Sequence, residues 1–145
     1  MSTRYQPGKA WTITILLALF MLVNFIDKIV IGLVAVPMMK ELSLTPVEFG
    51  VVAGSFFWLF AISGVAGGFL SNRIKASTLL LVMAGLWAAL QFPIAFSTSM
   101  TILIVARVLL GITEGPAWPV AVHACFKWFP DEKRNLPVSV IAQGA

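Results

Sequence analysis

WTITILLALFMLVNFIDKIVIGLVAV, residues 11–36, is apolar over almost its whole length. It is long enough to cross a bilayer as one helix, which takes about 20 residues at a rise of about 1.5 Å each. The exception is the neighbouring pair Asp27 and Lys28 near its outer half. A charge near the membrane centre opposes insertion by roughly 2.5 to 3.5 kcal/mol, so this pair must face protein or water. The stretch predicts a membrane-spanning helix with a polar site inside the bundle.

The composition extends this interpretation to the whole chain. Of its 145 residues, 59% are hydrophobic and only 11% are charged, and the mean hydropathy is +0.95. This is too apolar for a soluble domain and predicts an all-α integral membrane protein. The single cysteine, Cys125, cannot form an internal disulfide. The basic residues are scattered among spans and short loops, so nucleic acid is not an expected partner, and the lipid bilayer is.

Three more segments are long and apolar enough to cross a bilayer: residues 49–70, 77–96 and 100–128. A fifth helix is expected to begin at Pro137, because proline suits the first turn of a helix. Residues 1–145 are therefore expected to hold four transmembrane helices and the start of a fifth, as a piece of a larger bundle.

The basic residues in the loops predict the orientation in the membrane. Cytoplasmic loops carry an excess of Lys and Arg. On one side of the predicted membrane the loops hold only Lys40, together with the acidic Glu41 and Glu48. The other side holds Arg4, Lys9, Arg73, Lys75, Lys127, Lys133 and Arg134. The N-terminus is therefore expected in the cytoplasm.

Four ionisable residues fall at membrane depth: Asp27, Lys28, Arg107 and Glu114. Arg107 and Glu114 are seven residues apart, which places them on one helix face. Counting the rise along each helix puts Asp27, Lys28 and Arg107 in one layer just outside the midplane, with Glu114 beneath. We expect these side chains to face one another, with Asn24 completing the polar patch on the first helix.

This cluster has two interpretations. It can be a structural ion-pair network, although buried ion pairs stabilise a fold no better than well-packed hydrophobic residues do. Alternatively it is a functional cluster, in which a dry carboxylate binds and releases a proton as its cationic neighbour changes partners. When both carboxylates are protonated, Lys28 and Arg107 leave positive charge for an anion, and Arg107 can grip a carboxylate with two parallel hydrogen bonds.

Small residues and prolines predict how the helices pack. The second span holds two pairs of small residues four apart, Gly50 with Gly54 and Gly64 with Gly68, and Gly54, Ala61 and Gly68 recur every seven residues. These residues predict a stripe for close helix approach. Pro116 and Pro119 remove backbone donors from the fourth span and predict a kink there.

Three stretches resemble the major facilitator superfamily, and specifically its anion:cation symporter family of organic anion carriers. NFIDKIVIGLVAVPMMKEL, residues 24–42, is similar to that family's first helix. Residues 56–74, FFWLFAISGVAGGFLSNRI, are similar to its second helix and the following loop. The most specific match is the fourth helix, ARVLLGITEGPAWPVAVHACFKWFPDEKR, residues 106–134.

The resemblance implies a role for each candidate residue. Asp27 and Glu114 match acidic residues implicated in proton coupling, whereas Lys28, Arg107 and Phe60 match positions at the substrate anion or its switching salt bridge. Lys28 stands where the family usually has arginine, so the planar fork is lost. The implied fold is two six-helix bundles, of which residues 1–145 form part of the N-terminal one. The remaining helices of the same transporter are its expected partners, and no cofactor or metal is implied.

The resulting hypothesis is a secondary active transporter in the inner (plasma) membrane that imports a small organic anion, such as a sugar acid or other carboxylate, with protons by alternating access. One alternative is a four-helix exporter of cationic drugs, although Lys28 and Arg107 repel cations. Another is a membrane assembly protein that transports nothing. An enzyme is not expected, because no residues show metal-binding or nucleophile spacing.

Overall fold

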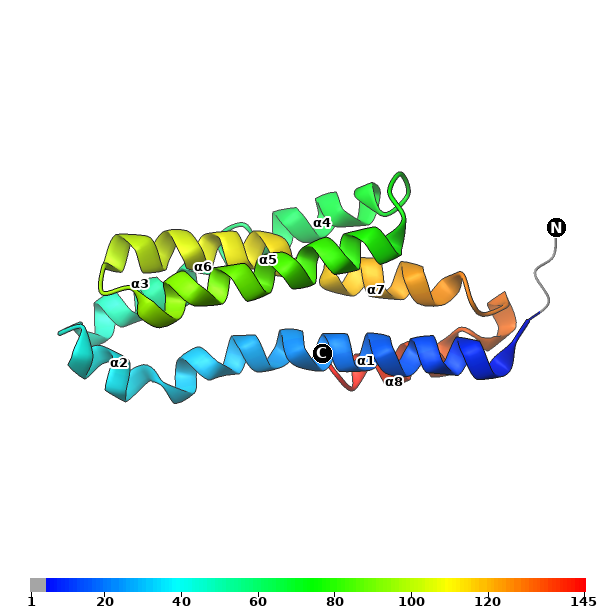
Figure 1. The fold of residues 1–145 in the computed structure, drawn as a ribbon, viewed down its shortest axis with the longest axis horizontal. Helices are drawn as coiled ribbons and strands as arrows, with labels where there is room; N and C mark the ends of the chain where they lie inside the picture. The colour runs from blue at the N-terminus through cyan, green and yellow to red at the C-terminus, as the bar shows by residue number, and fades with distance from the viewer. Residues whose placement is uncertain (1–4) are drawn as a thin grey trace.

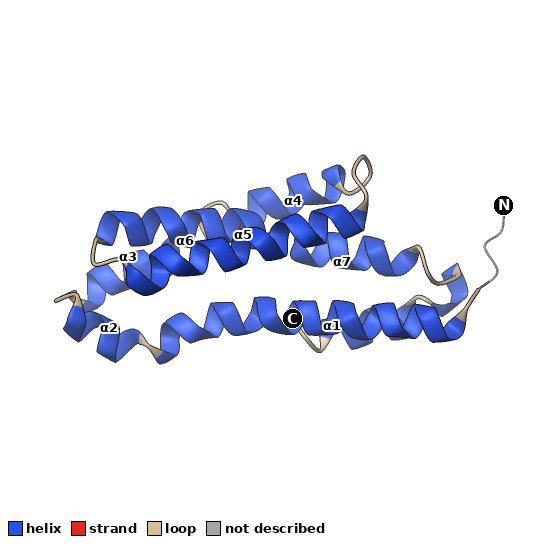
Figure 2. Ribbon diagram, in the orientation of Figure 1, coloured by secondary structure: helices blue, strands red, loops and turns tan. Residues whose placement is uncertain are grey.

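The computed structural model describes residues 5–145, all of whose regular elements are helices (Figure 1 and Figure 2). Arg4, which contributed to the predicted orientation, lies outside the described residues. The helices are α1 (Pro7–Leu33), α2 (Ala35–Glu41), α3 (Pro46–Ser55), α4 (Phe60–Leu70), α5 (Ala76–Phe96), α6 (Met100–Glu114), α7 (Ala117–Phe126), the 3₁₀ turn η1 (Asp131–Lys133) and α8 (Asn135–Ala142).

The expectation of four helices long and apolar enough to cross a membrane is confirmed. The spans are Pro7–Leu33, Pro46–Leu70, Ala76–Phe96 and Met100–Phe126. The first begins earlier than its apolar stretch because Pro7 occupies the first helical turn. α8 already begins at Asn135, and it packs along α1 with Ile141 fully buried.

The spans form two groups that meet at a common core. α3–α4, α5 and α6–α7 lie together, and α1 runs alongside them with α8 against it (Figure 1). Buried residues of this core include Met21, Phe56, Trp87, Leu110 and Val120. Many large apolar side chains on the outside remain exposed, as expected for helices long and apolar enough to cross a membrane.

The second and fourth spans are each interrupted near the middle. The fourth breaks between Glu114 and Ala117, as predicted from Pro116, whose ring removes a backbone donor. The second breaks over residues 56–59, between α3 and α4, a break that the hydropathy pattern does not predict. The two interrupted spans contact one another on both sides of the breaks.

The predicted glycine stripe is correct at Gly64 and wrong at Gly50, Gly54 and Gly68. A Cβ built on Gly54 meets nothing within 4 Å, and one on Gly68 makes only an ordinary contact with Pro119. The close helix approach uses Gly64 and Gly67 in α4, with Gly111 and Gly115 in the fourth span. The reason is the break at residues 56–59, which shifts the helical phase between residues 54 and 61.

The loop between the first two spans is mostly helical. Glu41 ends α2, whereas Glu48 lies in the first turn of α3. Thr45 caps α3: its Oγ1 accepts a hydrogen bond from the Glu48 amide at 3.2 Å, and its own amide donates to Glu48 Oε2 at 2.8 Å.

Candidate anion and proton site

α1 and α6 bring a lysine, an asparagine and a glutamate together in the core. Glu114 is the last residue of α6, and its side chain is 0% exposed. Its Oε2 accepts a hydrogen bond from Asn24 Nδ2 at 2.9 Å and lies 3.6 Å from Lys28 Nζ. Oε1 is buried with no hydrogen-bond partner among the described residues. One carboxylate oxygen is thus held by α1, and the other is available to a proton.

Lys28 is the more accessible member of this group. Its side chain is 24% exposed, and Nζ also donates to the Asn24 side-chain oxygen one turn earlier. The ammonium lies 5.4 Å from the centre of the Phe60 ring, at the start of α4. Lys28 therefore contacts the Glu114 carboxylate and the Phe60 ring while part of its side chain remains accessible.

Arg107 is buried without a carboxylate partner. Only 3% of the residue is exposed, and its Nε has no hydrogen-bond partner in residues 5–145. No Asp or Glu of this range lies within ion-pair distance of it. The guanidinium instead lies 4.9 Å from the centre of the Phe56 ring. Unpartnered buried cations are costly, and they concentrate where a ligand supplies the missing partner.

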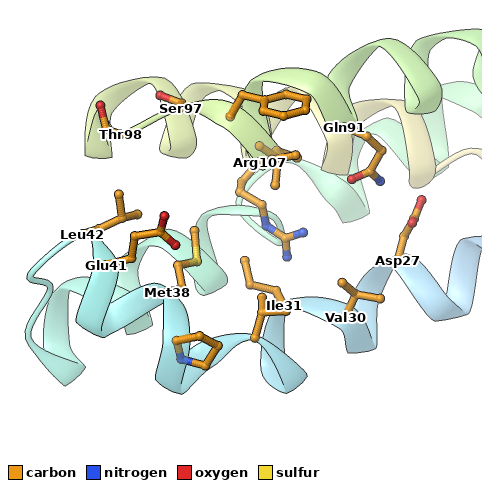
Figure 3. Close-up of a pocket in the computed structure, with 15 residues that line it drawn as sticks. Asp27, Val30, Ile31, Met38, Glu41, Leu42, Gln91, Ser97, Thr98 and Arg107 are labelled. Atoms are coloured by element: carbon orange, nitrogen blue, oxygen red, sulfur yellow. The ribbon is translucent and has the colours of Figure 1, made fainter.

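A pocket of about 420 Å³ opens beside Arg107 in the middle of α6, between the C-terminal part of α1, α2 and the C-terminal end of α5. Asp27 and Gln91 line it with Arg107, and Figure 3 shows the three polar groups pointing into the same space. The remaining lining is mostly apolar, with Glu41, Ser97 and Thr98 at its outer part.

The expected layer of charges is therefore divided into two. Asp27 and Lys28 are adjacent in α1, so their side chains leave the helix about 100° apart. Lys28 turns with Asn24 toward Glu114, whereas Asp27 turns toward Gln91 and Arg107. The sequence predicts one polar patch of Asn24, Asp27 and Lys28. In the structure Asp27 does not belong to it and faces the pocket instead.

As a lone amide in an otherwise apolar span, Gln91 is expected from the sequence to hold helices together and not to bind a ligand. The structure places it in the pocket lining with Asp27 and Arg107. Phe60 lies next to Lys28. Residues 5–145 contain no group of three or more His, Cys, Asp or Glu that could hold a metal ion.

Comparison with known proteins identifies the family. Residues 13–144 match the model of the Major Facilitator Superfamily. The probable anion transporter 2, chloroplastic, of Oryza sativa subsp. japonica is 30% identical over 140 residues, which is 95% of this chain and 26% of the relative.

Two further relatives carry names of specific anions. The probable sulfoacetate transporter SauU of Cupriavidus necator is 29% identical over 120 residues, 83% of this chain and 28% of the relative. The sodium-dependent phosphate transport protein 1, chloroplastic, of Arabidopsis thaliana is 27% identical over 139 residues, 94% of this chain and 27% of the relative. The chain thus spans about a quarter of the length of these curated relatives. The resemblance drawn from the motifs is confirmed: the chain belongs to the Major Facilitator Superfamily.

Proposed function

We propose that this chain is the N-terminal part of an organic anion:proton symporter, which imports a small carboxylate such as a sugar acid by alternating access. The observation that carries the proposal is how the two cations are partnered. Lys28 pairs with the buried carboxylate of Glu114, whereas Arg107 has no carboxylate partner in residues 5–145. Relatives named as anion transporters support the anionic substrate.

Coupling follows from competition for Lys28. With Glu114 ionised, Lys28 is held by its carboxylate, and the charges of the cluster balance. When Glu114 takes up a proton, Lys28 loses its counter-ion and a buried positive charge remains, which is unfavourable until an anion binds. The proton and the anion therefore enter together and leave together.

The other residues have distinct roles in this proposal. Arg107 supplies the second positive charge and a bidentate donor set for a carboxylate. Asp27 lines the same pocket as Arg107 and takes up a second proton, so that its negative charge no longer attracts the Arg107 guanidinium. Phe60 forms an aromatic wall beside Lys28.

The orientation proposed is a cytoplasmic N-terminus in the inner (plasma) membrane. Figure 1 places the start of α1, the α4–α5 connection and the α7–α8 connection at one end of the bundle, with α2 at the other. The other end has Lys40 in α2, whereas the first end has the basic residues Lys9, Arg73, Lys75, Lys127, Lys133 and Arg134. This distribution matches the excess of positive charge in cytoplasmic loops.

The test is transport by the full-length protein in proteoliposomes. Gluconate, succinate, sulfoacetate and phosphate are offered separately under an inward proton gradient, an inward sodium gradient or neither. We expect uptake of a carboxylate that requires the proton gradient. Uptake driven only by sodium contradicts proton coupling, and transport of the cation choline in place of every anion contradicts the proposal altogether.

A further inference from the structure

The break in the second span places an aromatic cluster between the two cations. Phe56 and Phe57 lie in the turn, and Phe60 starts α4. Phe56 contacts the other two rings, with centroid separations of 4.9 Å to Phe57 and 5.3 Å to Phe60. The guanidinium of Arg107 lies over the Phe56 ring, and the ammonium of Lys28 lies over the Phe60 ring.

We infer that Phe56 is a positioning residue for Arg107: its ring face holds the guanidinium apart from the carboxylates, so that the hydrogen-bond donors stay free for the substrate anion. This inference rests on the proposed function, because it assigns the reason why Arg107 remains ready to bind an anion. Phe56 itself needs no contact with the substrate.

The structure fixes Phe56 firmly enough for this role. The residue is 0% exposed, and its backbone carbonyl packs against Gly111. Gly111 lies one turn after Arg107 on the same face of α6. α6 thus holds both Arg107 and the glycine against which the Phe56 backbone packs. This contact between Gly111 and residue 56 places the ring next to the guanidinium.

An aromatic face suits this task better than a carboxylate does. The negative face of the ring attracts a cation, and the attraction is larger when the pair is removed from water, as it is here. Unlike a carboxylate, the ring does not neutralise the guanidinium or occupy its N–H groups along their bond directions. Arg107 Nε is without a hydrogen-bond partner among the described residues, and Figure 3 shows the guanidinium pointing into the pocket.

The chain provides a matched control. Phe57 is the next residue, lies in the same turn and is exposed, and neither Lys28 nor Arg107 covers its ring. A general effect of fluorinating a ring in this turn appears at both positions, whereas the positioning role is confined to Phe56.

The experiment replaces Phe56 in the full-length transporter with phenylalanines bearing one, two and three fluorines, which weaken the negative ring face at nearly constant shape. Affinity is measured for gluconate, or for whichever of succinate, sulfoacetate and phosphate the parent binds. We expect a stepwise loss of about 5- to 30-fold in total, the size of a desolvated cation–aromatic contact. The same series at Phe57 is expected to give no trend. A flat series at Phe56, or equal losses at both positions, overturns the inference.

A measurement without substrate separates this inference from the proposed function. In ¹⁵N-arginine-labelled full-length protein, the Nε–H signal of Arg107 is identified by its loss in Arg107→Lys. The Phe56 ring is expected to shift this signal upfield, and Phe56→Leu moves it downfield whereas Phe57→Leu does not. An unmoved signal in Phe56→Leu refutes the placement of Arg107. If the signal moves but no anion in the panel binds, the proposed function fails and the contact stands.

Discussion

Replacing Gly111 with alanine is expected to force the second and fourth spans apart. A Cβ built on Gly111 lies 2.9 Å from the carbonyl carbon of Phe56 and closer still to the carbonyl oxygen, whereas ordinary contacts begin near 3.4 Å. The obstacle is backbone, which cannot rotate away as a side chain can. The helices must therefore separate by about an ångström or more, because the carbonyl oxygen is the nearer atom, and overpacking of this kind costs about 1 to 3 kcal/mol.

Thermal unfolding of the full-length protein in detergent measures this cost. Gly85→Ala is the matched control, because a Cβ at Gly85 in α5 meets nothing within 4 Å. There the substitution is expected to be neutral or to stabilise by up to about 1 kcal/mol through helix propensity. If Gly111→Ala unfolds at the same temperature as the parent or as Gly85→Ala, the close approach at Phe56 is refuted.

Two further substitutions test individual hydrogen bonds. Asn24→Leu removes the 2.9 Å donor to Glu114, and it is expected to destabilise the protein by about 1.5 to 3 kcal/mol, as hydrogen bonds to charged groups do; unchanged unfolding of the variant contradicts the contact. Thr45→Ala removes the α3 cap and is expected to cost about 1 kcal/mol in the same unfolding assay, whereas Thr45→Ser keeps the hydroxyl and is expected to cost little. Equal losses for the alanine and serine variants show that the cap is not the cause.

Hydropathy predicts the four spans because the requirement for about 20 apolar residues leaves few alternatives. The break at Pro116 was equally predictable, since the missing donor is a local property of one residue. The break at residues 56–59 was not, because no proline or glycine lies in FFWL and the turn is set by packing against the fourth span. That break is also why a seven-residue repeat identified the wrong glycines.

The candidate site shows the same division. The spacing of Arg107 and Glu114 correctly places both in the interior, because a continuous helix joins them. The partners of each charge depend on the relative rotation of α1 and α6, which no spacing within one helix determines. Lys28 therefore pairs with Glu114, and Asp27 meets Gln91 and Arg107 in the pocket.

The central claim is that the substrate anion and Glu114 compete for Lys28, and Glu114→Gln tests it most directly. Glutamine keeps the shape and can still hydrogen-bond Asn24, but it leaves Lys28 without a counter-ion and cannot exchange a proton. In proteoliposomes of the full-length protein, uptake driven by a proton gradient is expected to be lost, whereas exchange of labelled for unlabelled anion without a gradient persists. Gradient-driven uptake by Glu114→Gln at the parent's rate contradicts the account.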